Sequence, residues 1–289
     1  MNERPESEMV SPPNGPSFGL VWPIQRIRDD GHEQVDDRVV LEEPLEIVVN
    51  GQRIAVLMRL PGQEKELAAG FCISEGYVRD VADILLIHHC GQGLPGPTSS
   101  GGDVGGSRHR VELQVARQGY NPPDQPGVTR LIRSGCGAAE VSLLGETLPF
   151  VSHELRVSAA TLLRLNRAMR DLQRVHPQIG GTHSAALFEA DGRTVILAED
   201  IGRHNAVDKA LGHCLLRGIP FSDKILVTSG RASYEMVQKA VRVGIPIAAS
   251  ISTPTSLAVQ LAEDRGLTLI GYLRGGRMNV YTHPWRVMT

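Results

Sequence analysis

Several side chains that can do chemistry follow one another between Glu199 and Lys209. Two acids precede Gly202, Arg203 and His204, and apolar residues then recur at helical spacing from Asn205 onward. The N–H groups at the start of a helix attract anions, so this junction could bind an anionic ligand. It could also be the charged cap of a surface helix. The roles of Glu199, Asp200 and His204 stay open between ligand contact and loop scaffolding.

A second reactive candidate is Cys136, which lies between two glycines in the segment Arg133-Ser134-Gly135-Cys136-Gly137. Flanking glycines expose the sulfur and let backbone N–H groups turn toward it. Those groups, together with the charge of Arg133, would favour the thiolate, which is the nucleophilic form of cysteine. The local pattern fits a nucleophile and an ordinary loop cysteine equally well.

Three predicted strands end in polar loops, which read Thr228-Ser229-Gly230-Arg231, Ser252-Thr253-Pro254-Thr255 and Arg274-Gly275-Gly276-Arg277. Ligands of open α/β sheets bind in the crevice outside the carboxyl ends of the strands. Glycine beside arginine permits close approach to phosphate, which a guanidinium group holds with two hydrogen bonds. We therefore expect an anion site at Arg231, Arg274 and Arg277, with Arg203 and Lys209 as candidates to join it. Solvated arginines in turns are the alternative, and neither a Walker motif nor a Gly-x-Gly-x-x-Gly fingerprint after a strand is present.

The elements that would position these residues alternate along the second half of the chain. Helical spacing covers 161–175, 234–242, 257–263 and a stretch that begins at Asn205. Strand patterns cover 183–190, 193–198, 225–228, 247–251 and 267–273, with a hairpin turn at Asp191-Gly192. Strands separated by helices imply right-handed parallel crossovers. We expect a three-layer α/β/α sheet with an attached antiparallel hairpin.

The first half of the chain combines predicted strands with a helix. Asn50-Gly51 predicts the turn of a hairpin between strands at 45–49 and 54–60, followed by a helix at 64–72 and strands at 84–88 and 111–115. Gly-, Ser- and Pro-rich stretches predict a loop at 91–107 and a linker at 118–127.

Composition limits the class of protein. The 289 residues carry a formal net charge of -2 and are 41% hydrophobic, which describes a soluble globular protein with one large domain or two ordinary ones. No basic surplus indicates nucleic acid, and no apolar run predicts a signal peptide or a membrane span. The four cysteines, at 72, 90, 136 and 214, show neither metal spacing nor a disulfide framework, so we expect a cytoplasmic protein.

Several segments together resemble the formate dehydrogenase accessory sulfurtransferase family (FdhD/NarQ). They are 64–76, 199–209, Ser229-Gly230-Arg231 with Glu235-Met236, 252–255 and Asn279-Val280-Tyr281-Thr282, and they follow the family's order. The resemblance covers residues 38–286. It implies a cytidine-deaminase-like C-terminal domain, a smaller N-terminal domain and a loop that carries the reactive cysteine. The predicted division is a disordered tail at 1–37, an N-terminal α+β domain at 38–130, a cysteine-bearing loop at 131–149 and a deaminase-like α/β domain at 150–289.

The resemblance also implies a function. A cysteine desulfurase supplies sulfur as a persulfide, and the protein passes it to the molybdenum cofactor bis(molybdopterin guanine dinucleotide), which then goes to formate dehydrogenase. Cys136 matches the persulfide-bearing cysteine, and Tyr272 to Arg277 match the segment expected to contact the cofactor. The predicted cofactor site comprises Arg203, His204, Ser229, Arg231, Thr253, Tyr272, Leu273, Arg274, Gly275, Gly276 and Arg277.

One position departs from the family pattern. Many members have Cys-x-x-Cys in the reactive loop, and Ala139 stands at the second cysteine position here. A disulfide within that motif is therefore impossible in this chain. A single thiolate can still accept a sulfane sulfur and present it to an electrophilic metal.

Two other functions compete with the sulfurtransferase. A delivery chaperone would bind and hand over the cofactor without handling sulfur. A zinc hydrolase is disfavoured, because zinc deaminases need His-x-Glu and Pro-Cys-x-x-Cys, whereas this chain has His183-Ser184-Ala185 and lacks the second motif. We expect no bound zinc, and a homodimer because symmetric oligomers are common. Molybdenum or tungsten as the metal, and formate dehydrogenase or a related oxidoreductase as the client, stay open.

Overall fold

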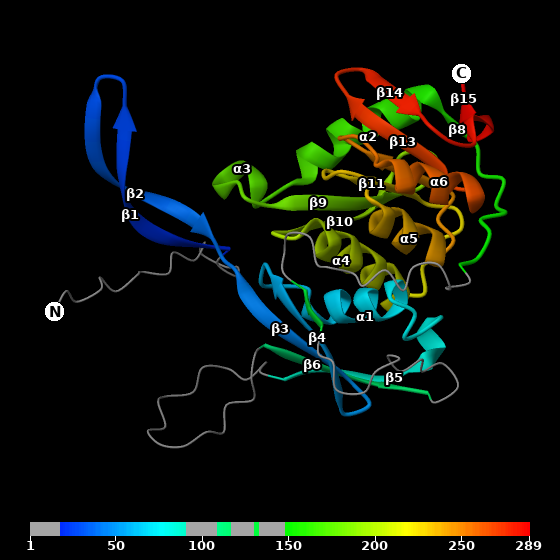
Figure 1. The fold of residues 1–289 in the computed structure, drawn as a ribbon, viewed down its shortest axis with the longest axis horizontal. Coiled ribbons are helices and arrows are strands. Elements are labelled where there is room, and N and C mark those ends of the chain that lie inside the picture. The colour runs from blue at the N-terminus through cyan, green and yellow to red at the C-terminus, as the bar shows by residue number, and fades with distance from the viewer. Residues whose placement is uncertain (1–17, 91–108, 117–129, 133–147) are drawn as a thin grey trace.

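The computed structural model describes residues 18–90, 109–116, 130–132 and 148–289. Two sheets lie on opposite sides of a layer of helices, and a two-stranded hairpin projects from one end of the body (Figure 1). Cys136 with most of its predicted loop, the predicted loop at 91–107 and the predicted linker at 118–127 lie outside the described residues.

The larger sheet has six strands in the order β10-β9-β11-β12-β13-β14. Their bounds are β9 (His183–Phe188), β10 (Thr194–Asp200), β11 (Ile225–Thr228), β12 (Ile247–Ser250), β13 (Thr268–Arg274) and β14 (Arg277–Val280). β11, β12 and β13 are parallel, as predicted, and β9 runs antiparallel to both of its neighbours.

Strand β14 is an addition to the predicted set, and it folds back along β13. Gly275 and Gly276 occupy the turn with φ of 60° and 72°. Two consecutive residues with positive φ favour a two-residue hairpin turn, and glycine adopts them at no steric cost. Residues 274–277 thus follow the parallel strand β13 as a polar loop, as predicted, and this loop is also the tip of the hairpin with β14.

Helices cover both faces of this sheet. α4 (Arg203–Leu216), α5 (Tyr234–Arg242) and α6 (Ser256–Asp264) pack on one face, and α2 (Ala159–Leu172) packs on the other. Successive strand residues alternate between the faces, so that Leu187 and Leu226 point toward α4 while Phe188 and Val227 point toward α2. The mixed α/β class is confirmed, whereas the cytidine-deaminase-like layering stays a prediction.

Helix α2 ends at Leu172, three residues before the predicted end, because the backbone N–H groups that follow donate to Glu199 instead of continuing the helix. The Glu199 carboxylate accepts hydrogen bonds from the N–H groups of Arg174, Val175 and His176 at 2.7, 2.9 and 2.9 Å. The short helix α3 (His176–Ile179) begins there. Glu199 is thus a scaffold for this turn.

The smaller sheet has the order β5-β6-β3-β4-β7, and α1 (Glu64–Ser74) joins its apolar side chains in one core cluster. Its strands are β3 (Glu43–Val49), β4 (Gln52–Arg59), β5 (Ile84–Cys90), β6 (Arg110–Val115) and β7 (Arg130–Ile132). The predicted hairpin turn is confirmed by positive φ at both Asn50 and Gly51. The remaining short elements are η1 (Val81–Asp83), β8 (Val157–Ser158), η2 (Pro284–Arg286) and β15 (Val287–Met288).

The prediction of a disordered tail at 1–37 was wrong from residue 19 onward. β1 (Gly19–Arg28) and β2 (Gly31–Val40) pair antiparallel along their whole length. The ribbon packs little of its surface on the body, so its sequence lacks the buried apolar face by which strands are recognised. Its backbone is satisfied by the pairing itself, with a cross-strand ion pair of 2.9 Å between Arg28 and Glu33. Residues 1–17 lie outside the described part.

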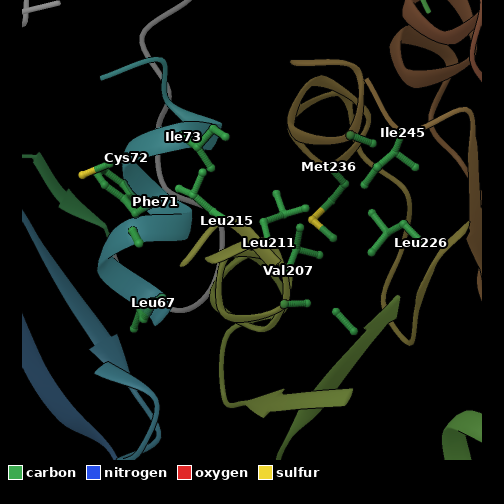
Figure 2. Packing of buried hydrophobic residues seen from close by; sticks show 14 of the residues in the cluster. Leu67, Phe71, Cys72, Ile73, Val207, Leu211, Leu215, Leu226, Met236 and Ile245 are labelled. Carbon is green, nitrogen blue, oxygen red and sulfur yellow. The ribbon is translucent and has the colours of Figure 1, made fainter. Parts of the chain in front are cut away.

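Among the glycines of the described residues, the closest backbone approaches join α1 to α4. A Cβ added at Gly70 would overlap the carbonyl group of Asp208, and one added at Gly212 would overlap the carbonyl group of Glu66. The two helix backbones therefore touch, which only glycine at both positions permits. Figure 2 shows the apolar cluster around this crossing, in which Val207 and Leu211 of α4 lie beside Met236 of α5. This one cluster joins the two predicted domains, and their division stays a prediction.

A buried ion pair lies at the same junction. The ammonium group of Lys209 lies 2.7 Å from Asp200 Oδ2, and both side chains are at most 1% exposed. Lys209 also donates to the carbonyl oxygen of Leu60 at 2.9 Å, while Asn205 donates to Asp200 at 2.9 Å and to the carbonyl oxygen of Met58 at 2.8 Å. The expectation that Lys209 joins the anion site was wrong, because its ammonium group is buried, pairs with Asp200 and binds the β4–α1 loop.

A second buried cation, Lys239, binds the C-terminal end of α1. Lys239 of α5 donates to Asp208 at 2.9 Å, to Ser74 at 2.7 Å and to Glu75 at 3.0 Å. Burial alone would lower the pKa of Lys239, but the charges of Asp208 and Glu75 raise it above its ordinary value.

Among the described residues, no helix is long and apolar enough to cross a membrane.

We predict that Gly212→Ala destabilises the protein by about 3 kcal/mol or more, because α1 and α4 must separate to admit one methyl group. Urea unfolding followed by circular dichroism measures this loss. Gln260→Ala, on the exposed face of α6, is the matched control and should leave stability unchanged. Unaltered stability of Gly212→Ala would contradict the backbone contact.

We predict that Lys209→Met lowers the free energy of unfolding by about 3–5 kcal/mol, because it leaves the Asp200 carboxylate buried without a counter-charge. The double variant Asp200→Asn/Lys209→Met should recover part of this loss, because it removes both charges. Thermal unfolding at neutral pH compares the two variants. If the double variant is as unstable as the sum of its single variants, the two side chains do not act as a pair.

Candidate functional site

The start of β9 and the loop after β11 are joined by hydrogen bonds at one end of the strands of the six-stranded sheet. The Ser229 hydroxyl accepts a hydrogen bond from the Ser184 N–H at 2.9 Å and lies 3.2 Å from His183 Nδ1. The Ser229 N–H donates in turn to the Ser184 carbonyl oxygen at 2.9 Å. Ser229 and His183 are thereby fixed in one place at this end of the strands.

The loop after β12 continues this surface. Ser250 donates from its hydroxyl to the carbonyl oxygen of Gly230 at 2.6 Å, and the N–H of Ala232 donates to the carbonyl oxygen of Thr253 at 3.3 Å. Tyr272 of β13 donates its N–H to the carbonyl oxygen of Ser252 at 2.9 Å. The loops after β11 and β12 and the far end of β13 thus form one continuous rim, as the strand-end argument predicts.

The N-terminus of α4 lies against this rim. Its N-cap is Gly202, which has no side chain to cap the helix. The Arg203 side chain packs on Gly230, where an added Cβ would lie 3.0 Å from Arg203 Cδ. Glycine at 230 therefore makes room for the stem of the arginine. We call the surface formed by Arg203, His204, Ser229, Arg231, Thr253 and Tyr272 the strand-end site.

Glu235 is a neighbour of this site that sequence analysis did not assign to it. Its Oε2 atom lies 2.8 Å from His204 Nε2. This contact with His204 is the largest of the effects that hold the pKa of Glu235 below its usual value. The carboxylate thus orients the imidazole ring of His204 at the start of α4. The pairing joins two elements far apart in the sequence, so spacing alone gives no signal of it.

The electrostatic environment favours an anion. Burial lowers the pKa of His183, and the positive charge of Arg203 and the nearby rings of His176 and His204 lower it further. His183 is therefore neutral at neutral pH, and it becomes easier to protonate once an anion offsets these charges. The exposed guanidinium of Arg231 and the uncapped amides of α4 act in the same direction.

The rest of the predicted cofactor segment divides between two environments. Arg274, Gly275, Gly276 and Arg277 are exposed at the β13–β14 turn, and the guanidinium carbon of Arg274 lies 5.5 Å from the centre of the Tyr272 ring. Leu273, in contrast, is fully buried in the cluster under α2. Its side chain packs in the core and leaves only its backbone near the turn.

The described cysteines differ from the nucleophile pattern. Cys72 and Cys214 are buried on helices, as predicted, and Cys90 is half-buried at the end of β5. Burial raises the pKa of Cys214 to about 11, and it raises that of Cys72 further still. Neither of these two thiols ionises readily at neutral pH.

Comparison with known proteins agrees with this architecture. The family model described as the FdhD/NarQ family matches residues 40–288. A protein of Mycobacterium bovis named sulfur carrier protein FdhD is 40% identical over 281 residues, which covers 93% of this chain and 100% of the relative. A protein of the same name from Streptomyces coelicolor is 42% identical over 274 residues, which covers 91% of this chain and 94% of the relative.

A solved structure extends the likeness to three dimensions. The crystal structure of a putative formate dehydrogenase accessory protein from Desulfotalea psychrophila superposes with a TM-score of 0.75 and 30% sequence identity. The match covers 94% of this chain and 100% of that one. Matches of this length include both sheets and the strand-end site. The chain therefore belongs to the FdhD/NarQ family.

Proposed function

We propose that this protein is a sulfur carrier that serves formate dehydrogenase. The observation that carries the proposal is the match, over nearly the whole chain, to relatives named sulfur carrier protein FdhD. The reactive group is the Cys136 thiolate, which accepts a sulfane sulfur from the persulfide of a cysteine desulfurase. A bond forms between the Cys136 sulfur and the terminal sulfur, and the desulfurase cysteine leaves as a thiolate.

The acceptor in this proposal is bis(molybdopterin guanine dinucleotide) carrying molybdenum, bound as a substrate. The terminal sulfur of the persulfide becomes a sulfide ligand of the metal, and Cys136 leaves as a thiolate. The sulfur takes up two electrons in this step, and the reduced metal centre supplies them. One cysteine is sufficient, so Ala139 at the second cysteine position is compatible with the cycle.

The strand-end site is the proposed holder of the cofactor's anionic tail. Arg203 and Arg231 supply positive charge, while Ser229 and Thr253 supply hydroxyl groups on a rim that is already fixed by hydrogen bonds. The β13–β14 turn adds Arg274 and Arg277 beyond the end of the sheet. A preorganised rim of this kind loses little entropy when a charged ligand binds.

A delivery chaperone that binds the cofactor without handling sulfur is the second candidate. The observation that favours it is Ala139, because many family members carry a second cysteine there. Both candidates imply formate dehydrogenase as the client and a cytoplasmic location, and we expect a homodimer in either case. They differ in the need for a cysteine desulfurase and for Cys136.

We predict that Cys136 alone loads sulfur. Incubation with a cysteine desulfurase and cysteine should add 32 Da to the wild-type protein, the mass of one sulfur atom, as measured by mass spectrometry under non-reducing conditions. Cys136→Ser should gain nothing and should fail to activate formate dehydrogenase. Cys90→Ala is the matched control and should load normally. Normal formate dehydrogenase activation by Cys136→Ser would reject the carrier and leave the delivery chaperone.

We predict that guanine nucleotides bind the strand-end site, because they mimic part of the cofactor's tail. Arg231→Ala and Arg274→Ala should each weaken binding by about 1.5–3 kcal/mol if each arginine makes a charge-assisted hydrogen bond. Added salt should weaken binding as well. Calorimetry with GDP measures both effects. Arg193→Ala is the control, because Arg193 lies at the β9–β10 turn, at the end of β9 opposite to His183. Equal affinity in all the variants would remove this site from the proposal.

A further inference from the structure

A groove of about 670 Å³ runs beside β10, and none of the residues that line it belongs to the strand-end site. β10 is the last strand of the six-stranded sheet, and among the described residues no strand pairs with its outer edge. The groove is lined mainly by apolar side chains from four separate parts of the chain. They include Phe18, Leu60, Pro61, Leu172, Val175 and Ile196. The volume is within the range of ligand and peptide clefts.

The pairing of β10 shows which of its backbone groups face this groove. Ser184 of β9 uses its N–H and carbonyl oxygen on the β11 side, so Glu199, its partner in register, turns its own amide groups away from β9. Lys209 confirms the direction, because it donates to the Glu199 carbonyl oxygen from outside the sheet. Strand residues repeat every second position, so Leu197 also presents its N–H and carbonyl oxygen outward.

The groove also has an exposed basic side chain at one wall. Arg174 lines it and makes no ion pair with any described residue. The other two charged side chains in the lining are already used. Glu199 accepts three backbone N–H groups, and Lys209 is paired with Asp200. An occupant with apolar side chains and an acid near Arg174 therefore fits this lining.

We propose that the groove along β10 binds an extended acidic segment of a partner protein, which adds a strand to the sheet at Leu197. Backbone hydrogen bonds to Leu197 provide affinity, and the groove takes the apolar side chains on one side of the added strand. The carboxylate of the segment pairs with Arg174. This surface leaves the strand-end site free, so partner and cofactor can be held together.

Two other occupants fit less well. Residues 1–17 end beside Phe18, but they contain four prolines, which lack the N–H that a ladder needs. A second copy of the chain would have to bring its own β10 into contact. The edge lies between walls formed by 60–63 on one side and 172–175 on the other, and two concave surfaces of this kind do not interdigitate.

The test uses a phage library of random ten-residue peptides against the full chain. We expect selected sequences with apolar residues at every second position and at least one acid. A labelled peptide, titrated by fluorescence anisotropy, should bind about five- to tenfold more weakly to Leu197→Pro, which removes the outward N–H, than to Leu197→Ala, which keeps that N–H and also lacks the leucine side chain that lines the groove. Arg174→Gln should weaken binding and reduce its salt dependence, whereas Arg170→Gln, on the exposed side of α2, should not.

Several results would overturn the proposal. A library without binders, or a peptide that binds Leu197→Pro and Arg174→Gln as tightly as wild type, rejects the added strand. Hydrogen exchange covers the case in which Leu197→Pro fails to fold, because the bound peptide must slow amide exchange at 194–199 in the wild-type protein. Tighter binding after deletion of residues 1–17 assigns the groove to that segment. A peptide that dissociates a dimer assigns it to a second copy.

Discussion

The rest of the structure depends on the contact between the backbones of α1 and α4. Gly70 and Gly212 allow the two helices to touch, and the apolar cluster around them belongs to both sheets. Helix α4 carries this contact in its middle and Arg203 and His204 at its start. The strand-end site at the start of α4 therefore lies about one to two and a half helical turns from the contact that joins α4 to α1. Close packing transmits a shift at one end of a helix to the other.

The segment from Glu199 to Lys209 divides its charged residues between two roles. Asp200, Asn205 and Lys209 point into the protein and hold the β4–α1 loop, while Arg203 and His204 lie at the strand-end site. A buried ion pair adds little net stability, but it penalises every arrangement in which one partner loses the other. This segment therefore fixes how α1 and α4 meet and places the two basic side chains by the same helix start.

The sequence predicted the parts of the fold that bury one face. The parallel strands, α4 to α6 and the Asn50-Gly51 hairpin have clear apolar periods and turn residues, and all are present. The β1–β2 ribbon was missed because it buries little surface. The buried position of Lys209 was missed because the spacing of residues does not show that Lys209 pairs with Asp200, which lies 9 residues earlier in the sequence. At the site, the rule for strand ends located Ser229 and Thr253 correctly on one rim. It could not find Glu235 or exclude the Leu273 side chain, since both depend on packing between distant elements.

The site therefore combines a rigid part with an exposed part. The rim around Ser229 is held by hydrogen bonds from three strands and lies over two layers of core, so its geometry is coupled to global stability. Arg274 and Arg277 lie at a glycine turn with no burial, where a substitution changes charge without disturbing the core. The rim would fix the position of an anionic ligand that spans both parts, and the positive charges of the turn would attract it. Affinity for the proposed anionic tail can then vary at the turn while the rim keeps its geometry through the core.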